Sequence, residues 1–259
     1  MIDNEEEYRR MFEVEQKLWW YGRLHRMVLK NIRQQFEDRQ IRILDAACGT
    51  GGLLSYLHAK GYKNCSGFDA SAHAVKFSKD RQLDVDLGDL RKVNAFRPEQ
   101  TYDVICCNDA LYFLTDEEIS DTLRQFKSRL VPNGMILINI HAFQVFAGTH
   151  DLAVGSSRRF TLKDFQKLTK DTGLQITHST YWPFTLALPI SLVRGFQRLQ
   201  IKRGAYRDTK PESDVKYPGD FINNTLEKLM RFEEKWLPRA PFGSSLFMQL
   251  KPEISHQSY

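Results

Sequence analysis

The chain has 259 residues, a formal net charge of +5 at pH 7 and a pI near 8.9, so it can bury a substantial core in one or two domains. This mildly basic balance permits an anionic substrate or a membrane surface but does not require nucleic acid, and we expect no DNA partner. No run reaches the roughly 18 apolar residues that span a bilayer, and the acidic first residues indicate no signal peptide, so we expect a cytoplasmic protein.

The first predicted element is a helix. Residues 5–35 carry apolar side chains every three and four positions, with charges between them. Within this stretch an unusual run of aromatic residues occupies 19–21 and precedes Gly22 and Arg23. Composition alone favours packing of these rings against the rest of the protein.

Residues 41–52 (IRILDAACGTGG) predict a strand, a tight glycine turn and the start of a helix. Gly49 and Gly51 allow backbone angles that a side chain disfavours, and such a turn places bare amide groups where open α/β sheets bind ligands. The dinucleotide-binding fingerprint would need a glycine at Leu54, and the chain has no Gly-Lys-Ser or Gly-Lys-Thr phosphate loop. The turn therefore predicts a different nucleotide-like ligand.

Acidic residues stand at the ends of the next two predicted strands. Asp69 ends a short apolar strand, and Asp89 ends a strand over residues 83–90 that alternates apolar and polar positions. Asp89 can be an exposed turn residue, but its place beside Asp69 in the sheet favours a role in binding. A fourth buried strand begins at Tyr102 and reaches Asn108, and a fifth covers residues 135–140.

These motifs resemble class I S-adenosylmethionine-dependent methyltransferases over residues 41–140. The resemblance implies a Rossmann-like, seven-stranded, doubly wound α/β sheet. It also implies that the glycine turn holds the methionine part of the cofactor, Asp69 the ribose hydroxyls and Asp89 the adenine amino group. In this family an N-terminal helix often covers the cofactor, which implies contacts from the aromatic segment. The implied cofactor-binding residues are Tyr21, Arg23 (through the cofactor carboxylate), Asp45, Ala47, Gly49, Gly51, Asp69, Ala70, Asp89, Leu90 and Asn108.

Beyond the fifth strand, a segment from His141 to Thr161 resembles a bacterial methyltransferase subgroup associated with glycan or lipid assembly. The subgroup carries a His-Asp pair followed by Arg-Arg-aromatic-Thr, although Ser156 replaces a frequent histidine here and His141 a frequent proline. A base is needed only if the acceptor keeps its proton, and His150, oriented by Asp151, would provide one. The alternative is that this pair caps the loop and bonds to the following arginines.

A sixth strand is predicted around residues 174–181 and a seventh at 245–250, and the long segment between them indicates a functional insertion. We expect an N-terminal helical cover at 1–36, a core at 37–183 and 243–252, and a helical insertion or lid at 184–242. The first part of this insertion, residues 184–203, has the pattern of an amphipathic basic helix, and a loop at 204–219 and a helix at 220–236 follow it. Its apolar face either packs on the sheet, or serves a lipid-tailed acceptor or an anionic membrane surface as a peripheral contact.

We therefore predict an enzyme that uses S-adenosylmethionine to methylate a small-molecule or lipid- or glycan-linked acceptor on oxygen or nitrogen. An RNA methyltransferase is an alternative, but the chain lacks a dedicated basic and aromatic RNA-binding module. A cofactor-binding protein without catalysis is the second alternative. The four cysteines have no metal-ligand spacing, so we expect reduced, buried thiols and no metal site.

Overall fold

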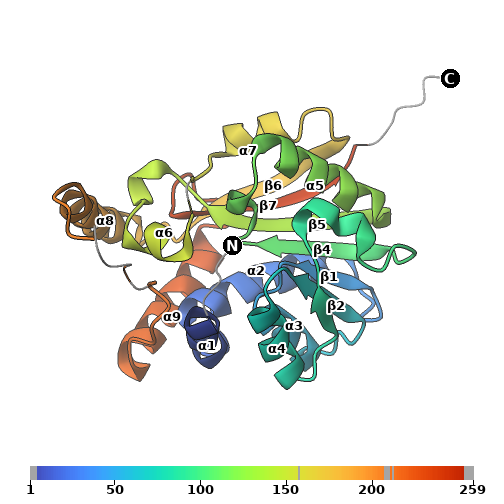
Figure 1. Ribbon diagram of the computed structural model, residues 1–259, viewed down its shortest axis with the longest axis horizontal. Coiled ribbons are helices and arrows are strands. Elements are labelled where there is room, and N and C mark those ends of the chain that lie inside the picture. Colours follow the sequence, from blue (N-terminus) through green and yellow to red (C-terminus); the bar gives the residue numbers. More distant parts are fainter. Residues whose placement is uncertain (1–4, 157, 207–210, 212, 254–259) are drawn as a thin grey trace.

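The computed structural model describes residues 5–156, 158–206, 211 and 213–253 of the protein. The described residues form a seven-stranded sheet of order β3-β2-β1-β4-β5-β7-β6 (Figure 1). β7 runs antiparallel to both of its neighbours, and the other pairs are parallel. This confirms the predicted doubly wound sheet. The strands are β1 (Ile43–Ala46), β2 (Cys65–Asp69), β3 (Val85–Leu87), β4 (Tyr102–Asn108), β5 (Leu130–His141), β6 (Leu174–Trp182) and β7 (Ser245–Pro252).

The centre of the sheet lies at β1 and β4. The chain builds outward from β1 to β3 on one side and returns to place β4 on the other. Both central strands are covered on both faces, which is why their sequences are almost continuously apolar. In open sheets of this kind a crevice opens at the carboxyl ends of the strands where the order reverses. The fold therefore places a ligand site beyond the ends of β1 and β4.

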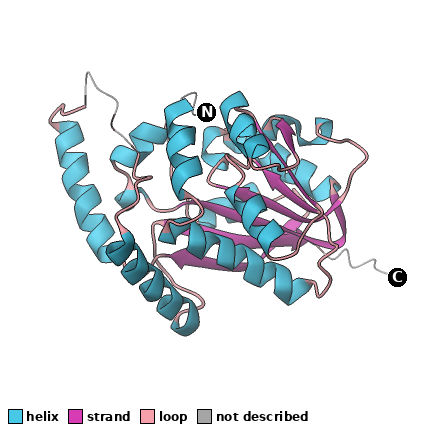
Figure 2. Ribbon diagram, turned by 90° about the horizontal axis from the view of Figure 1, so that it is seen from below, coloured by secondary structure: helices cyan, strands magenta, loops and turns pink. Residues whose placement is uncertain are grey.

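Helices cover both faces of the sheet (Figure 2). On one face, buried residues of α2 (Trp19–Gln35), α3 (Gly52–Ala59) and α4 (Ala72–Asp80) form an apolar cluster with the strands. On the other face a second cluster includes η1 (Leu90–Ala95), η2 (Leu111–Phe113), α5 (Asp116–Ser128) and α7 (Leu162–Leu168). All four cysteines are buried and free, as expected. No helix in the described ranges is long and apolar enough to cross a membrane.

The predicted single N-terminal helix is broken into two. α1 (Glu5–Val14) ends before a short turn, and α2 starts at Trp19. The side chain of Asn223 bridges this break, because its Nδ2 donates to the Lys17 carbonyl and its Oδ1 accepts from the Trp19 amide, both at 2.9 Å. Asn223 belongs to α9 (Asp220–Trp236), so a distant helix stabilises the turn that local spacing does not indicate.

Two strands differ in extent from the expectation. β3 covers only Val85–Leu87 at the edge of the sheet, because Asp89 already caps η1 by accepting a hydrogen bond from the Arg91 amide at 2.9 Å. β5 begins at Leu130, where it pairs with Tyr102 before a register shift, so the predicted turn before residue 135 lies within the strand.

The insertion between β6 and β7 contains α8 (Ala187–Lys202) and α9, and α8 lies at the outer edge of the molecule (Figure 1). Of the two alternatives for the apolar face of α8, packing on the sheet is not what the structure shows. Arg198 points inward and donates to the Ala147 carbonyl at 3.0 Å, while large apolar residues face outward. We call Leu188, Leu192, Val193, Phe196 and Leu199 the outer apolar face of α8. In the predicted loop at 204–219, residues 207–210 and 212 lie outside the described residues.

Candidate active site

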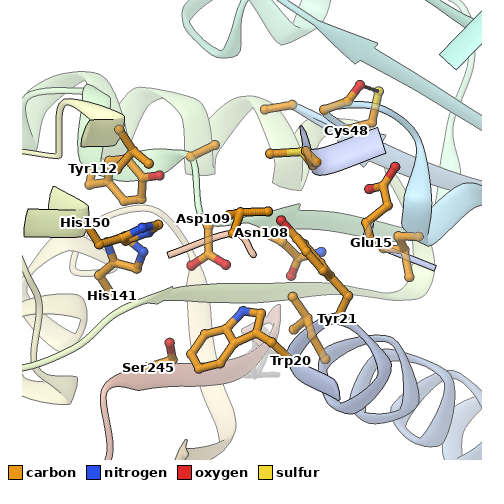
Figure 3. A pocket seen from close by; sticks show the side chains of 18 of the residues that line it. Glu15, Trp20, Tyr21, Cys48, Asn108, Asp109, Tyr112, His141, His150 and Ser245 are labelled. Carbon is orange, nitrogen blue, oxygen red and sulfur yellow. Dashed lines mark hydrogen bonds between the residues drawn. The ribbon is translucent and has the colours of Figure 1, made fainter. Parts of the chain in front are cut away.

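A cavity of about 540 Å³ opens at the carboxyl ends of the central strands. Its wall includes the glycine turn after β1, the ends of β2, β4 and β5, and residues of α1, α2 and α8. Short segments also contribute, namely η3 (Gln144–Phe146), α6 (Thr149–Val154) and residues 214–216. The volume is in the range of small-molecule sites, about 300–1,000 Å³. Figure 3 shows side chains that converge on this space from several elements.

The glycine turn forms one end of the cavity. Gly49 and Gly51 have φ angles of 55° and 80°, in the left-handed region that favours glycine. A Cβ on Gly51 would lie 2.4 Å from Cδ1 of Leu83, so a side chain at this position would also displace that leucine. Ala47, with φ of 61°, and Cys48 line the same end.

Asp69 connects the turn to the end of β2. Its carboxylate accepts hydrogen bonds from the amides of Gly49 and Ser71, each at 2.9 Å, and the residue is only 8% exposed. Burial raises the pKa of Asp69, and the backbone hydrogen bonds oppose that rise. A carboxylate has about four lone-pair positions, so Asp69 keeps capacity for hydroxyl donors in the cavity. Ala70 lines the wall beside it.

Asp45 and Asn108 lie deeper, at the ends of β1 and β4. Burial, followed by the negative charges of Asp69 and Glu15, raises the pKa of Asp45 well above its usual value, which favours a neutral carboxyl group. Asn108 has a buried Oδ1 with no hydrogen-bond partner among the described residues. A buried acceptor without a donor is costly, so this atom indicates that a ligand with a donor group belongs here.

Asp89 and Leu90 form the outer wall of this half of the cavity. Leu90 is buried, whereas the Asp89 side chain is 41% exposed and forms an ion pair with Arg91 at 3.2 Å. The structure thus brings Asp89 to the cavity while leaving it partly solvated.

Tyr21 and Arg23, the two cofactor-binding residues predicted from the aromatic segment, point to different sides of α2. Tyr21 faces the cavity near Asn108 (Figure 3). Arg23 points to the other side of α2, where it is buried and forms an ion pair with Glu234 of α9 at 3.0 Å. Arg23 is therefore not among the residues that line the cavity, and the expected contact with the cofactor carboxylate is not supported. Helix periodicity explains the difference, because residues two apart lie on different faces.

Glu15, which the sequence analysis did not identify, lies over the glycine turn. Its carboxylate accepts hydrogen bonds from the Thr50 hydroxyl and from Arg81, and Arg81 also donates to the Phe12 carbonyl at 2.7 Å. These contacts connect the N-terminal segment to the turn. Burial raises the pKa of Glu15, while Arg81 and Thr50 oppose the rise. Glu15 had no recognisable motif, since its partners lie 35 and 66 positions away.

At the opposite end of the cavity lie His141 and His150 (Figure 3). His141 stacks on Tyr112 with ring centroids 4.7 Å apart and lies 5.5 Å from His150. Burial, more than any nearby charge, lowers the pKa of both imidazoles. The Nδ1 atom of His150 accepts a hydrogen bond from the Asp214 amide at 3.2 Å.

Asp151 does not hydrogen-bond to His150 in the described structure. Its carboxylate accepts two hydrogen bonds from Arg159, from Nε at 2.7 Å and Nη2 at 3.0 Å, and a third from the Gly148 amide at 2.9 Å. This is the alternative in which the acidic residue caps the loop and pairs with the following arginine. Asp151 therefore has a structural partner other than His150.

Asp109 lies between these two ends of the cavity (Figure 3). Its carboxylate accepts hydrogen bonds from Nδ2 of Asn139, at 3.0 Å to each oxygen, and Oδ1 of Asn139 accepts from the Trp182 indole at 2.8 Å. Trp20 of α2 packs on Trp182, with ring centroids 4.3 Å apart. The strand-end position of Asp109 is visible in the sequence, but its partners are not. Among the described residues, no group of three or more His, Cys, Asp or Glu side chains is placed to hold a metal ion.

Comparisons with known proteins agree with this geometry. A family profile described as a methyltransferase domain matches residues 19–179, more than half of the chain. The malonyl-[acyl-carrier protein] O-methyltransferase of Halalkalibacterium halodurans is 28% identical over 171 residues, which cover 62% of this chain and 60% of that protein. The trans-aconitate 2-methyltransferase of Mycobacterium tuberculosis is 30% identical over 105 residues, or 40% of this chain and 38% of that protein.

Among solved structures, an S-adenosylmethionine-dependent methyltransferase from Clostridium acetobutylicum superposes with a TM-score of 0.55 at 12% identity, covering 90% of this chain and 92% of that chain. At that identity the similarity shows the fold alone. The profile match and the sheet topology lead to one conclusion: the chain belongs to the methyltransferase-domain family of S-adenosylmethionine-dependent methyltransferases, and S-adenosylmethionine is its cofactor.

Proposed function

We propose that this methyltransferase acts on a small-molecule or lipid-linked acceptor, on oxygen or nitrogen, at the end of the cavity between His150 and α8. The observation that carries the proposal is the composition of the single cavity wall described above. One end has the glycine turn and Asp69, and the other has Tyr112, His141 and the cavity-facing side of α8. Two ligands, one at each end of the cavity, would meet near Asp109. Aligning two reactants in a dry site can contribute about 7–11 kcal/mol to catalysis.

The cofactor would occupy the end of the cavity at the glycine turn and supply a methyl group bound to a sulfonium centre. We propose that Asp69 holds the ribose hydroxyls, since its carboxylate retains lone pairs toward the cavity. The turn and the unpartnered Oδ1 of Asn108 suit the polar methionine end, and Asp89 with Leu90 suits the adenine. Tyr21 would cover the cofactor from α2.

The nature of the acceptor is suggested by α8. Ile190 and Arg194 on this helix line the cavity, while its outer apolar face is open, with Leu188 70% and Phe196 62% exposed. The cavity can hold the polar head of an acceptor, and the outer face would accommodate an apolar tail. Malonyl-[acyl-carrier protein] and trans-aconitate, named in two distant relatives, are a carrier-linked and a free small acceptor.

We further propose that residues 184–203 contact an anionic membrane surface peripherally. Lys202 and Arg203 are exposed at the end of α8, next to the outer apolar face. Flotation with vesicles of mixed anionic and neutral phospholipid should recover the wild type but much less of a variant with Leu192→Ser and Phe196→Ser. Leu87→Ser, at an equally exposed apolar position on β3, is the matched control and should bind as wild type does. Equal recovery of all three proteins would refute the membrane contact.

The acceptor can be identified with S-adenosylmethionine that carries a deuterated methyl group. Purified enzyme is incubated separately with a lipid extract and an aqueous extract of cells, and labelled products are identified by mass spectrometry. A labelled lipid supports the tailed acceptor, and a labelled aqueous metabolite supports the small one. Label in RNA alone would favour the RNA-modifying alternative. Binding of S-adenosylhomocysteine without any labelled product would support the non-catalytic one.

A further inference from the structure

The carboxylate of Asp109 is held at the point where the two ends of the cavity meet. Asp109 follows the last residue of β4 with a φ of 51°, a left-handed conformation that asparagine and aspartate adopt more readily than most residues. Figure 3 shows its side chain between Asn108 and Tyr21 on one side and His141 and His150 on the other. A cofactor and an acceptor at the two ends would both lie beside this carboxylate.

Neighbouring strands fix the carboxylate. Asn139 of β5 bonds both oxygens of Asp109 through Nδ2, and its carbonyl accepts from the Asp109 amide at 2.8 Å. Trp182 of β6 donates to Oδ1 of Asn139, which fixes the orientation of the amide. Asn139 is 1% exposed and Trp182 is fully buried. These bonds use one lone pair on each oxygen, so each oxygen can accept one further hydrogen bond from the cavity.

The charged and titratable groups around Asp109 leave it able to exchange a proton at neutral pH. Burial raises the pKa of Asp109 to about 7, against the Asn139 hydrogen bond and the positive charge of Arg159. Tyr21 and Tyr112 face it from α2 and η2, and Cys107 lies on β4 two residues before it. Burial, with a smaller contribution from the Asp109 charge, raises the pKa of each of these three groups, so they stay neutral.

The facing groups on the acceptor side also remain uncharged or paired. Burial lowers the pKa of His141 and His150, so both imidazoles are neutral near pH 7. Arg159 is neutralised by Asp151, and Arg194 by an ion pair with Asp214. An anionic acceptor would therefore be repelled by the Asp109 carboxylate, and the two nearby arginines would not offset this repulsion because each is already paired with an aspartate. This arrangement favours a neutral acceptor that must lose a proton.

We propose that Asp109 is the general base of the reaction and that the acceptor group is a hydroxyl, a proposal that rests on the methyl transfer proposed above. The acceptor oxygen forms a bond to the methyl carbon while the carbon–sulfur bond breaks and its electron pair stays on sulfur. The hydroxyl proton passes to a carboxylate oxygen of Asp109 and is later released to water. Asn139 and Trp182 are positioning residues, because they act only through Asp109.

The first test needs no acceptor. In the complex with S-adenosylhomocysteine, the infrared absorption of buried protonated carboxylic acids should decrease between pH 5.5 and pH 8.5. Asp45, Asp69 and Glu15 contribute to this absorption in every variant, so the component due to Asp109 is the part of the decrease that is missing in Asp109→Asn. Asp121→Asn, the same change at an exposed position of α5, should keep the full decrease. If the wild type does not bind S-adenosylhomocysteine, the proposed function fails. If it binds and the decrease in absorption between pH 5.5 and pH 8.5 is as large in Asp109→Asn as in wild type, this inference fails.

The second test uses the hydroxyl acceptor identified by the deuterated methyl label. Asp109→Asn should lower kcat by at least about 100-fold, the usual contribution of a general base, with the KM for S-adenosylmethionine within threefold. Wild-type kcat should rise about tenfold per pH unit below about 7 and then level off. If Asp109→Asn keeps more than a third of wild-type kcat, or if His150→Gln instead abolishes the inflection, Asp109 is not the base. A selective tenfold loss of affinity for S-adenosylmethionine over S-adenosylhomocysteine would also overturn the proposal, in favour of a contact with the sulfonium charge.

Asn139→Ala separates positioning from general support of the fold. Because the Asn139 hydrogen bond lowers the pKa of Asp109, its loss should move the inflection in kcat to higher pH. Trp182→Phe, which removes the indole donor together with part of the buried ring, is the second variant if Asn139→Ala does not fold, and it should move the inflection in the same direction by a smaller amount. A lower rate with an unmoved inflection in the variant that folds would show that the residue does not act through Asp109.

Discussion

Replacing Asp69 with alanine tests the proposed cofactor site most directly. The carboxylate is 8% exposed and accepts hydrogen bonds of 2.9 Å from the Gly49 and Ser71 amides. If it also accepts the ribose hydroxyls, its loss removes a hydrogen bond to a charged group, which contributes about 1.5–3 kcal/mol. The dissociation constant for S-adenosylhomocysteine should therefore rise about 10- to 150-fold.

The assay is isothermal titration calorimetry with S-adenosylhomocysteine, well below the melting temperature of each variant. The temperature matters because alanine also leaves the two amides without their acceptor, at a cost of about 1–3 kcal/mol each in stability. Asp84→Ala is the matched control, since Asp84 is 61% exposed and pairs with Arg97 on the surface. Its affinity should stay within twofold of wild type. A folded Asp69→Ala protein with wild-type affinity would refute the ribose assignment.

Three further substitutions test the energetics around the site. Glu15→Ala leaves the buried guanidinium of Arg81 uncompensated, so the free energy of unfolding in urea should fall by about 3–5 kcal/mol, and a loss below 1 kcal/mol would contradict the buried pair. Asp151→Ala should cost a similar amount through Arg159, and we expect chemical denaturation to show it. Asp109→Asn should change the pH dependence of stability, because the folded-state pKa of Asp109 is raised from 3.8 to about 7. As the pH rises from about 4 to 7, wild type should therefore lose stability relative to the variant, by roughly 4 kcal/mol at most. Parallel curves of unfolding free energy against pH for the two proteins would exclude the shift.

Much of the fold follows from local patterns along the chain. The apolar runs of the central strands, the two glycines with left-handed backbone angles and the carboxylate at the end of β2 are each set by residues close in sequence. Parallel strands bring their carboxyl ends to one edge, so spacing alone placed Asp69 beside the glycine turn. The sheet and the family were therefore predictable before any contact was known.

The direction in which individual side chains point was not predictable in the same way. Arg23 lies on the face of α2 away from the cavity, where Glu234 of α9 pairs with it, and the carboxylate of Asp151 pairs with Arg159 and not with His150. In α8 the arginines point inward and the apolar face points to the solvent, whereas a usual surface helix buries its apolar face. The sequence left open both the partner of Asp151 and the direction of the apolar face of α8, and the tertiary contacts of each decide between the alternatives.

By itself, the sequence determined the doubly wound sheet and the glycine turn, because strand and turn preferences act over a few neighbouring residues, and the resemblance of these motifs to a known family gave the cofactor class. Only the tertiary structure decided that Asp109, Asn139 and Trp182 form one hydrogen-bonded chain. Their separations of 30 and 43 positions carry no pattern. The burial that sets the pKa of Asp109 likewise exists only when the strands and the N-terminal helices have closed around it.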